Sequence, residues 1–97
     1  MPYFATTYTY ADDTTEQRDT IRPEHRAYLA ELTDAGRLVL SGPYAGDPAG
    51  ALLVFEAATE ADARALTDAD PFVTAGVVAD VSVREWTTVS GRLASQL

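Results

Sequence analysis

The segment Ala51–Phe55 is apolar at every position and reads Ala-Leu-Leu-Val-Phe. A short apolar run of this kind is typical of a strand that is buried on both of its faces. Such a strand needs a packed layer above it and another below it. The rest of the chain must therefore provide helices for one face of a sheet and a further cover for the other.

Three other segments are predicted to be strands. Tyr3–Tyr10 is rich in Thr and Tyr, which are common in strands. Arg37–Tyr44 contains a run of apolar residues, and the turn composition of residues 45–50 joins it to Ala51–Phe55 as a hairpin. In Val77–Trp86, apolar and polar residues alternate, as expected for a strand with one buried face. Together these segments supply the strands of one sheet.

Two segments have the periodicity of helices. In Ile21–Ala35 apolar residues recur at intervals of three and four, and Thr20 is the predicted N-cap. Pro23 would then fall in the first turn, where its missing N–H does no harm. The second helix is predicted to begin after a capping Thr59 and to run to about Ala69.

The resulting order, β-α-β-β-α-β, is the ferredoxin-like arrangement of an α+β fold. It predicts a four-stranded antiparallel sheet with two helices on one face. The helices leave the other face open, and a chain of 97 residues buries only a modest share of its surface. A second copy of the sheet is the simplest cover, so we predict a homodimer in which two sheets face each other.

Charge and composition exclude several classes of function. The formal charge is −8, which opposes binding to the phosphates of nucleic acids and to anionic membrane surfaces. The chain has no cysteine, so disulfides, thiolate zinc sites and thiol nucleophiles are excluded. No apolar run is long enough to span a bilayer, and the N-terminus lacks the pattern of a signal peptide. We therefore expect a soluble, cytoplasmic protein.

The candidate chemistry rests on His25, the only histidine, and on Asp70. Helical spacing places His25 on the apolar face of its segment, while Pro71 biases Asp70 away from helical geometry and ends the second helix. An imidazole titrates near neutrality, and an adjacent carboxylate fixes its tautomer and stabilises its charged form. We hypothesise that the two residues meet and form a general base. The alternative is a structural hydrogen bond that ties two helix ends together.

Three further residues are candidates for contacts with a substrate. Arg22 lies one turn before His25 and near a helix N-terminus, which favours an anionic group, although a solvated surface arginine has the same pattern. Ser41 precedes a Gly-Pro pair and is a candidate hydrogen-bonding partner, with a bond to backbone as the alternative. Tyr8 is expected to line the pocket, unless it is an ordinary aromatic residue of the sheet.

Six segments form a recognisable series along the chain. They are Arg22–Leu29, Gly36–Pro43, Gly50–Val54, Ala63–Leu66, Asp70–Gly76 and Val83–Trp86. In this order and spacing they resemble the YciI-like proteins of the dimeric α+β barrel group. The resemblance covers residues 1–87 as one domain and leaves 88–97 as a C-terminal tail. It implies a ferredoxin-like protomer, a dimer, and a pocket that holds a His–Asp pair, here His25 and Asp70.

The resemblance also implies a class of activity. One relative is a dehydrochlorinase of a chlorinated hydroxyquinol, and neighbouring families include muconolactone isomerases. Proton transfer on a small oxygenated organic acid or phenol is therefore the first hypothesis, and a non-catalytic module that binds the same kind of molecule is the second. Some dimeric α+β barrels degrade haem with a helix histidine as axial ligand. The expected partner Asp70 argues against haem here, and no metal-binding spacing is present, so we predict no cofactor and no metal.

Overall fold

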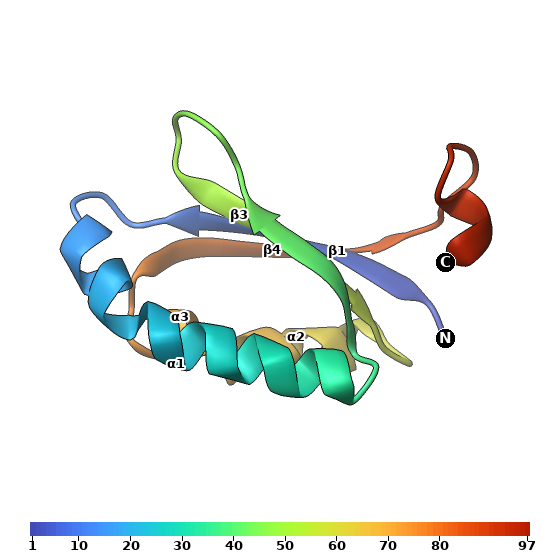
Figure 1. The fold of residues 1–97 in the computed structure, drawn as a ribbon, viewed down its shortest axis with the longest axis horizontal. Helices are drawn as coiled ribbons and strands as arrows, with labels where there is room; N and C mark the ends of the chain where they lie inside the picture. Colours follow the sequence, from blue (N-terminus) through green and yellow to red (C-terminus); the bar gives the residue numbers. More distant parts are fainter.

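The four strands form one antiparallel sheet in the computed structural model, which describes residues 1–97 (Figure 1). The strand order is β2-β3-β1-β4. The strands are β1 (Tyr3–Tyr10), β2 (Leu38–Pro43), β3 (Gly50–Glu56) and β4 (Val78–Trp86). The helices are α1 (Thr15–Asp34), α2 (Glu60–Asp68) and the single turn α3 (Pro71–Thr74), and a 3-10 turn, η1, covers Ala94–Gln96. This arrangement confirms the predicted ferredoxin-like α+β fold.

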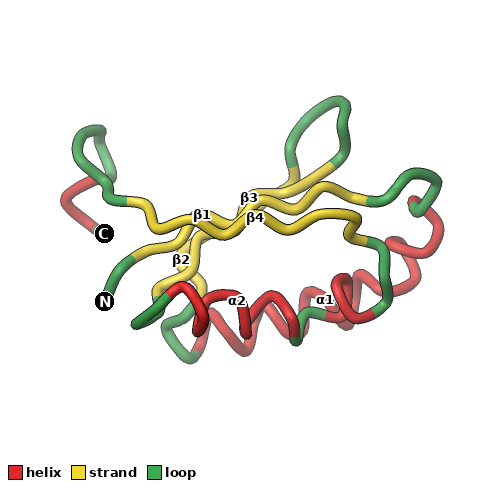
Figure 2. Tube along the Cα trace, turned by 180° about the vertical axis from the view of Figure 1, so that it is seen from behind, coloured by secondary structure: helices red, strands yellow, loops and turns green.

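The helices lie together on one face of the sheet, as Figures 1 and 2 show. β3 pairs with β2 on one side and with β1 on the other. Leu53 and Val54 point to opposite faces of the sheet and are each 1% exposed, in keeping with the apolar run. Alternate β3 residues point toward α1 and form the main core there. The cluster contains Tyr8, Leu32, Leu38, Ala51, Leu53 and Phe55.

The opposite face of the sheet has no helix on it. Figure 2 shows the loop between β2 and β3 and the C-terminal turn rising on this side, away from the helices. Apolar side chains of the sheet and of the tail meet there around a groove of about 550 Å³. Among its lining residues, Leu40 is 48% exposed and Trp86 is 44% exposed. No helix of the chain has both the length and the apolar character needed to cross a membrane.

α1 begins well before Ile21, so the predicted start of this helix was wrong, and Pro23 lies inside it. Proline inside a helix removes one backbone hydrogen bond, which is why the start was expected next to it. Side-chain contacts, one of them with β1, hold the first turns. The Nε of Arg18 donates to the hydroxyl of Thr14 at 3.2 Å, and its guanidinium lies 4.3 Å above the ring of Tyr10.

Pro71 ends one helical segment and begins the next. The cap at Thr59 is confirmed, because its hydroxyl accepts the N–H of Asp62 at 3.1 Å. As expected from Pro71, Asp70 lies outside helical geometry: it is extended, with φ −68° and ψ 127°. It is also the N-cap of α3, whose first residue is Pro71. The side chain of Asp70 is therefore oriented by capping geometry and not by a helical face.

Candidate active site

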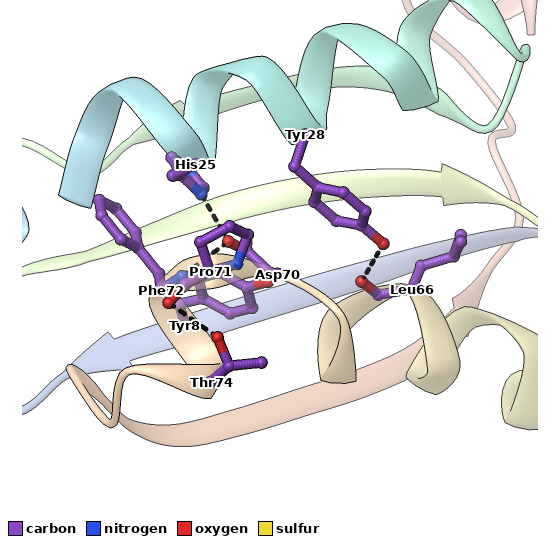
Figure 3. A network of polar contacts seen from close by, with 8 residues as sticks. All are labelled: Tyr8, His25, Tyr28, Leu66, Asp70, Pro71, Phe72 and Thr74. Carbon is purple, nitrogen blue, oxygen red and sulfur yellow. Dashed lines mark hydrogen bonds and ion pairs between the residues drawn. The ribbon is translucent and has the colours of Figure 1, made fainter.

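Asp70 is the buried polar centre of the site, with only 1% of its surface exposed. Its Oδ1 accepts the backbone N–H of Phe72 at 2.9 Å and lies 2.7 Å from Nδ1 of His25, while its Oδ2 accepts the hydroxyl of Tyr8 at 2.8 Å (Figure 3). Burial of a carboxylate is unfavourable unless donors surround it, and here three donors do. The carboxylate thereby joins β1, α1 and α3.

These contacts fix which nitrogen of His25 carries a proton. An ionised carboxylate only accepts hydrogen bonds, so the short Nδ1–Oδ1 contact places a proton on Nδ1. Burial, and then the negative charge of Asp70, raise the pKa of the Tyr8 hydroxyl, so this group also remains a donor. Nε2 of His25 has no hydrogen-bond partner in the protein, and the residue lines an open cleft. In the neutral imidazole, Nε2 is therefore a free proton acceptor.

An aromatic ring packs against one face of the imidazole. The ring of His25 stacks on Phe72 with centroids 3.9 Å apart and planes 6° apart. Tyr10 meets the same Phe72 edge-on, at 5.9 Å. Nearby, the hydroxyl of Tyr28 donates to the carbonyl of Leu66 at 2.7 Å and ties α1 to α2 (Figure 3). With Nδ1 fixed by Asp70 and one ring face fixed by Phe72, the direction of Nε2 is set.

The cleft beside His25 has a volume of about 310 Å³. α1 forms one wall, the end of β2 forms another, and the aromatic residues around His25 form part of the floor. The lining residues are Tyr10, Arg18, Arg22, His25, Arg26, Leu29, Ser41, Gly42, Pro43, Ala51, Leu53 and Phe72. The lining contains three arginines and no carboxylate. A space of this size suits a compact organic molecule.

A family model for the YCII-related domain matches residues 1–87. The chain belongs to the YCII-related family. Protein YciI from Escherichia coli and its counterpart from Shigella flexneri are each 38% identical to it over 86 residues, which cover 79% of this chain and 88% of the relative.

Two solved structures share the fold of this YCII-related chain. One is a 5-chloro-2-hydroxyhydroquinone dehydrochlorinase from Burkholderia phenoliruptrix, solved in complex with 2,5-dihydroxybenzoquinone. Its TM-score is 0.81 at 23% identity, over 90% of this chain and 95% of that one. The other is a protein from Pseudomonas aeruginosa, with a TM-score of 0.55 at 10% identity, over 91% of this chain and 93% of that one. At these identities the likeness shows the fold alone.

In this YCII-related protein four of the five predicted site residues lie where they were expected, and Tyr8 does not line the cleft. His25 and Asp70 are in direct contact, and Arg22 and Ser41 both line the cleft. Tyr8 is not part of the cleft wall, because it is 1% exposed and its hydroxyl donates to the buried carboxylate of Asp70. Tyr10 takes the wall position on the same face of β1. Strand alternation identifies that face but not which of its residues reaches the opening.

Sequence reasoning missed two arginines of the cleft. Arg18, Arg22 and Arg26 are spaced by four residues, so they lie along one face of α1. The spacing was visible in the sequence. Arg18 was missed because the helix was expected to start after it, and a residue outside the helix has no place on its face. Arg26 was inside the expected helix but off its apolar face.

Replacing Tyr8 with Phe is expected to lower the free energy of unfolding by about 1–3 kcal/mol, because a buried carboxylate oxygen loses its hydrogen-bond donor. Urea denaturation followed by circular dichroism measures the change. Tyr3→Phe is the matched control, since Tyr3 lies on the opposite face of β1 and makes no side-chain hydrogen bond. Equal stability of the two variants would contradict a stabilising role for the Tyr8 contact.

Proposed function

We propose that this protein is an enzyme in which His25 acts as a general base on a small oxygenated organic acid or phenol. One observation carries the proposal. Nδ1 of His25 is committed to a buried carboxylate, while Nε2 has no protein partner at a cleft lined by arginines. A base needs a free acceptor atom, a fixed direction and a stabilised charged form, and this geometry supports all three.

The reaction would begin with transfer of a proton from a hydroxyl, or from a carbon next to a carbonyl, to Nε2 of His25. The electron pair stays on the substrate as a phenolate or enolate, which the positive charge of the cleft favours. The imidazolium that forms gains from the negative charge of Asp70 and from the face of Phe72. Return of the proton to a different carbon gives an isomer, whereas departure of chloride with its electron pair completes an elimination.

The structural neighbour supports the class of substrate. That enzyme is a dehydrochlorinase of a chlorinated hydroxyhydroquinone and was solved with a dihydroxyquinone. Both molecules are single oxygenated rings of a size that the cleft of about 310 Å³ would hold. Proton transfer of this kind needs no metal and no redox cofactor, so we propose neither for this chain.

A second candidate is a binding module without turnover. It is favoured by the fact that the Asp70 contacts join β1, α1 and α3, a structural role that needs no chemistry. The two functions differ in solution. The purified protein, given a panel of hydroxyquinols, chlorinated hydroxyquinols and lactones, is expected to release chloride or to exchange carbon-bound hydrogen for deuterium by NMR. Binding of panel members without any exchange or release would support the binding module and reject the enzyme.

We also propose that the protein forms a homodimer through the face of the sheet that has no helix. The exposed side chains of Leu40 and Trp86 make this face apolar, and apolar surface of this kind favours association. Leu40→Glu is expected to convert a dimer into a monomer, measured by light scattering during size exclusion. Ala27→Glu, on the exposed side of α1, adds the same charge and should leave the dimer intact. A wild-type monomer would reject the proposal.

A further inference from the structure

One cleft of this acidic protein is lined by positive side chains. All seven basic residues are arginines, and three of them, Arg18, Arg22 and Arg26, line the cleft beside His25. The chain as a whole carries a formal charge of −8, yet no carboxylate lines that cleft. A recess with one sign of charge raises the local concentration of ions of the opposite sign. The cleft is therefore suited to an anion that the rest of the surface repels.

The three arginines are not equivalent. Arg22 forms an ion pair with Asp19, so part of its charge is already neutralised. Arg18 forms no ion pair within the protein. It is nevertheless held in place, because Nε donates to Thr14 at 3.2 Å and Nη2 donates to Thr15 at 3.3 Å.

The ring of Tyr10 further restricts Arg18, whose guanidinium carbon lies 4.3 Å from the ring centroid. An arginine with a fixed plane loses little side-chain entropy when it binds a ligand. Nη1 makes no hydrogen bond in the protein, and Nη2 retains one N–H that is free. These two nitrogens form the fork that binds both oxygens of a delocalised anion.

We propose that Arg18 is the subsite for an anionic group of the substrate, set apart from the atom that gives its proton to His25. The inference rests on the proposed role of His25 and adds the class of molecule. Arg18 and His25 are seven residues apart on α1, roughly two turns. Tyr10 contacts Arg18, Phe72 contacts Tyr10, and His25 stacks on Phe72, so aromatic rings connect Arg18 at one end of the cleft with His25 at the other.

The substrate class is a compact planar acid with an anionic group at one end of a ring and an acidic O–H or C–H at the other. A carboxylate fits the fork of Arg18. A hydroxyl conjugated to a carbonyl also fits, because such a group is a vinylogous acid and its anion is shared between two oxygens. Tyr10 and Phe72 line the cleft with their rings at 88° to each other, and this aromatic lining favours a ring over a flexible chain, since aromatic rings pack both stacked and edge-to-face.

The test compares two quinones of similar shape by isothermal titration. 2,5-Dihydroxybenzoquinone is acidic, and 2,5-dimethylbenzoquinone is its neutral counterpart; the chain has no cysteine or lysine side chain for either to modify. Arg18→Met is expected to weaken binding of the acidic quinone by about tenfold or more, the effect of losing one charge-assisted contact. Binding of the neutral quinone should change by less than about threefold.

The matched control is Arg64→Met, which removes the same charge from the exposed surface of α2. It should leave both affinities unchanged. Arg18→Lys keeps the charge and loses the fork, so its affinity for the acidic quinone should lie between those of the wild type and Arg18→Met. Should Arg18→Met fail to fold, as judged by circular dichroism, the lysine variant decides. Wild-type affinity in the variant that is tested, or equal loss for both quinones, would overturn the subsite.

The result separates this inference from the proposed function, because binding does not require turnover. If Arg18 is needed to bind the acidic quinone but the protein transfers no proton from any substrate, the subsite is supported and the proposed enzyme is rejected. If the protein turns substrates over but binds the acidic quinone equally well without Arg18, the enzyme is supported and the subsite is rejected.

Discussion

Replacing His25 with Asn is expected to lower turnover of any substrate found for this protein by about 10²–10⁴-fold, the usual contribution of a proton-transfer group. The amide nitrogen of Asn occupies nearly the position of Nδ1 in His, so it still donates to Asp70. No atom of Asn replaces Nε2. The variant therefore removes the proposed proton acceptor while it keeps the hydrogen bond that the fold uses.

Steady-state kinetics measures this effect, with circular dichroism and urea denaturation to confirm folding. His25→Ala is the informative comparison, because it also removes the donor to Asp70 and the stacking on Phe72. If His25 were only structural, His25→Ala would lower both stability and turnover, and His25→Asn would change both only slightly. We expect His25→Asn to change stability only slightly and to lower turnover strongly. Turnover by His25→Asn at the wild-type rate would reject His25 as the base.

Much of the fold was predictable, because local patterns and packing agree for most elements. The apolar composition of β3 indicated a central strand, and Thr59 was recognised as a cap because its side chain acts on its own turn. Helical spacing also placed His25 on the inner side of α1, where only 12% of its side chain is exposed. These features depend on neighbours close in the sequence, which is the range that periodicity and capping rules cover.

The errors arose where contacts between distant residues decide the outcome. The early start of α1 depends in part on Tyr10, which contacts Arg18 from another element. The position of Tyr8 under Asp70 joins residues 62 positions apart in the chain. Pro71 was correctly expected to keep Asp70 out of helical geometry, but the direction of the Asp70 side chain follows from the short helix that Pro71 starts. No local pattern contains these contacts, so Tyr8 was expected in the wall and Arg18 was overlooked.

Replacing Asp70 with Asn is expected to lower turnover by about 10²–10⁴-fold, mainly through kcat, because the imidazolium loses the negative charge that stabilises it. Asp70 is a positioning residue in this scheme, since it acts through His25 and not on the substrate. The substitution should also lower the free energy of unfolding by about 1–3 kcal/mol. The amide oxygen accepts from His25 and Phe72, which turns the NH₂ group toward Tyr8 and leaves the hydroxyl proton of Tyr8 without an acceptor.

Tyr8→Phe separates the two roles of the carboxylate. It removes a hydrogen bond from the same Asp70 and is expected to lower stability by a similar amount, yet it leaves the negative charge beside His25 in place. We therefore expect Tyr8→Phe to retain most of its turnover, whereas Asp70→Asn loses nearly all of it at equal stability. If both variants lose turnover only in proportion to their loss of stability, the charge of Asp70 has no role in proton transfer. The contact between His25 and Asp70 is then a structural tie, and the enzyme transfers the proton without help from that charge.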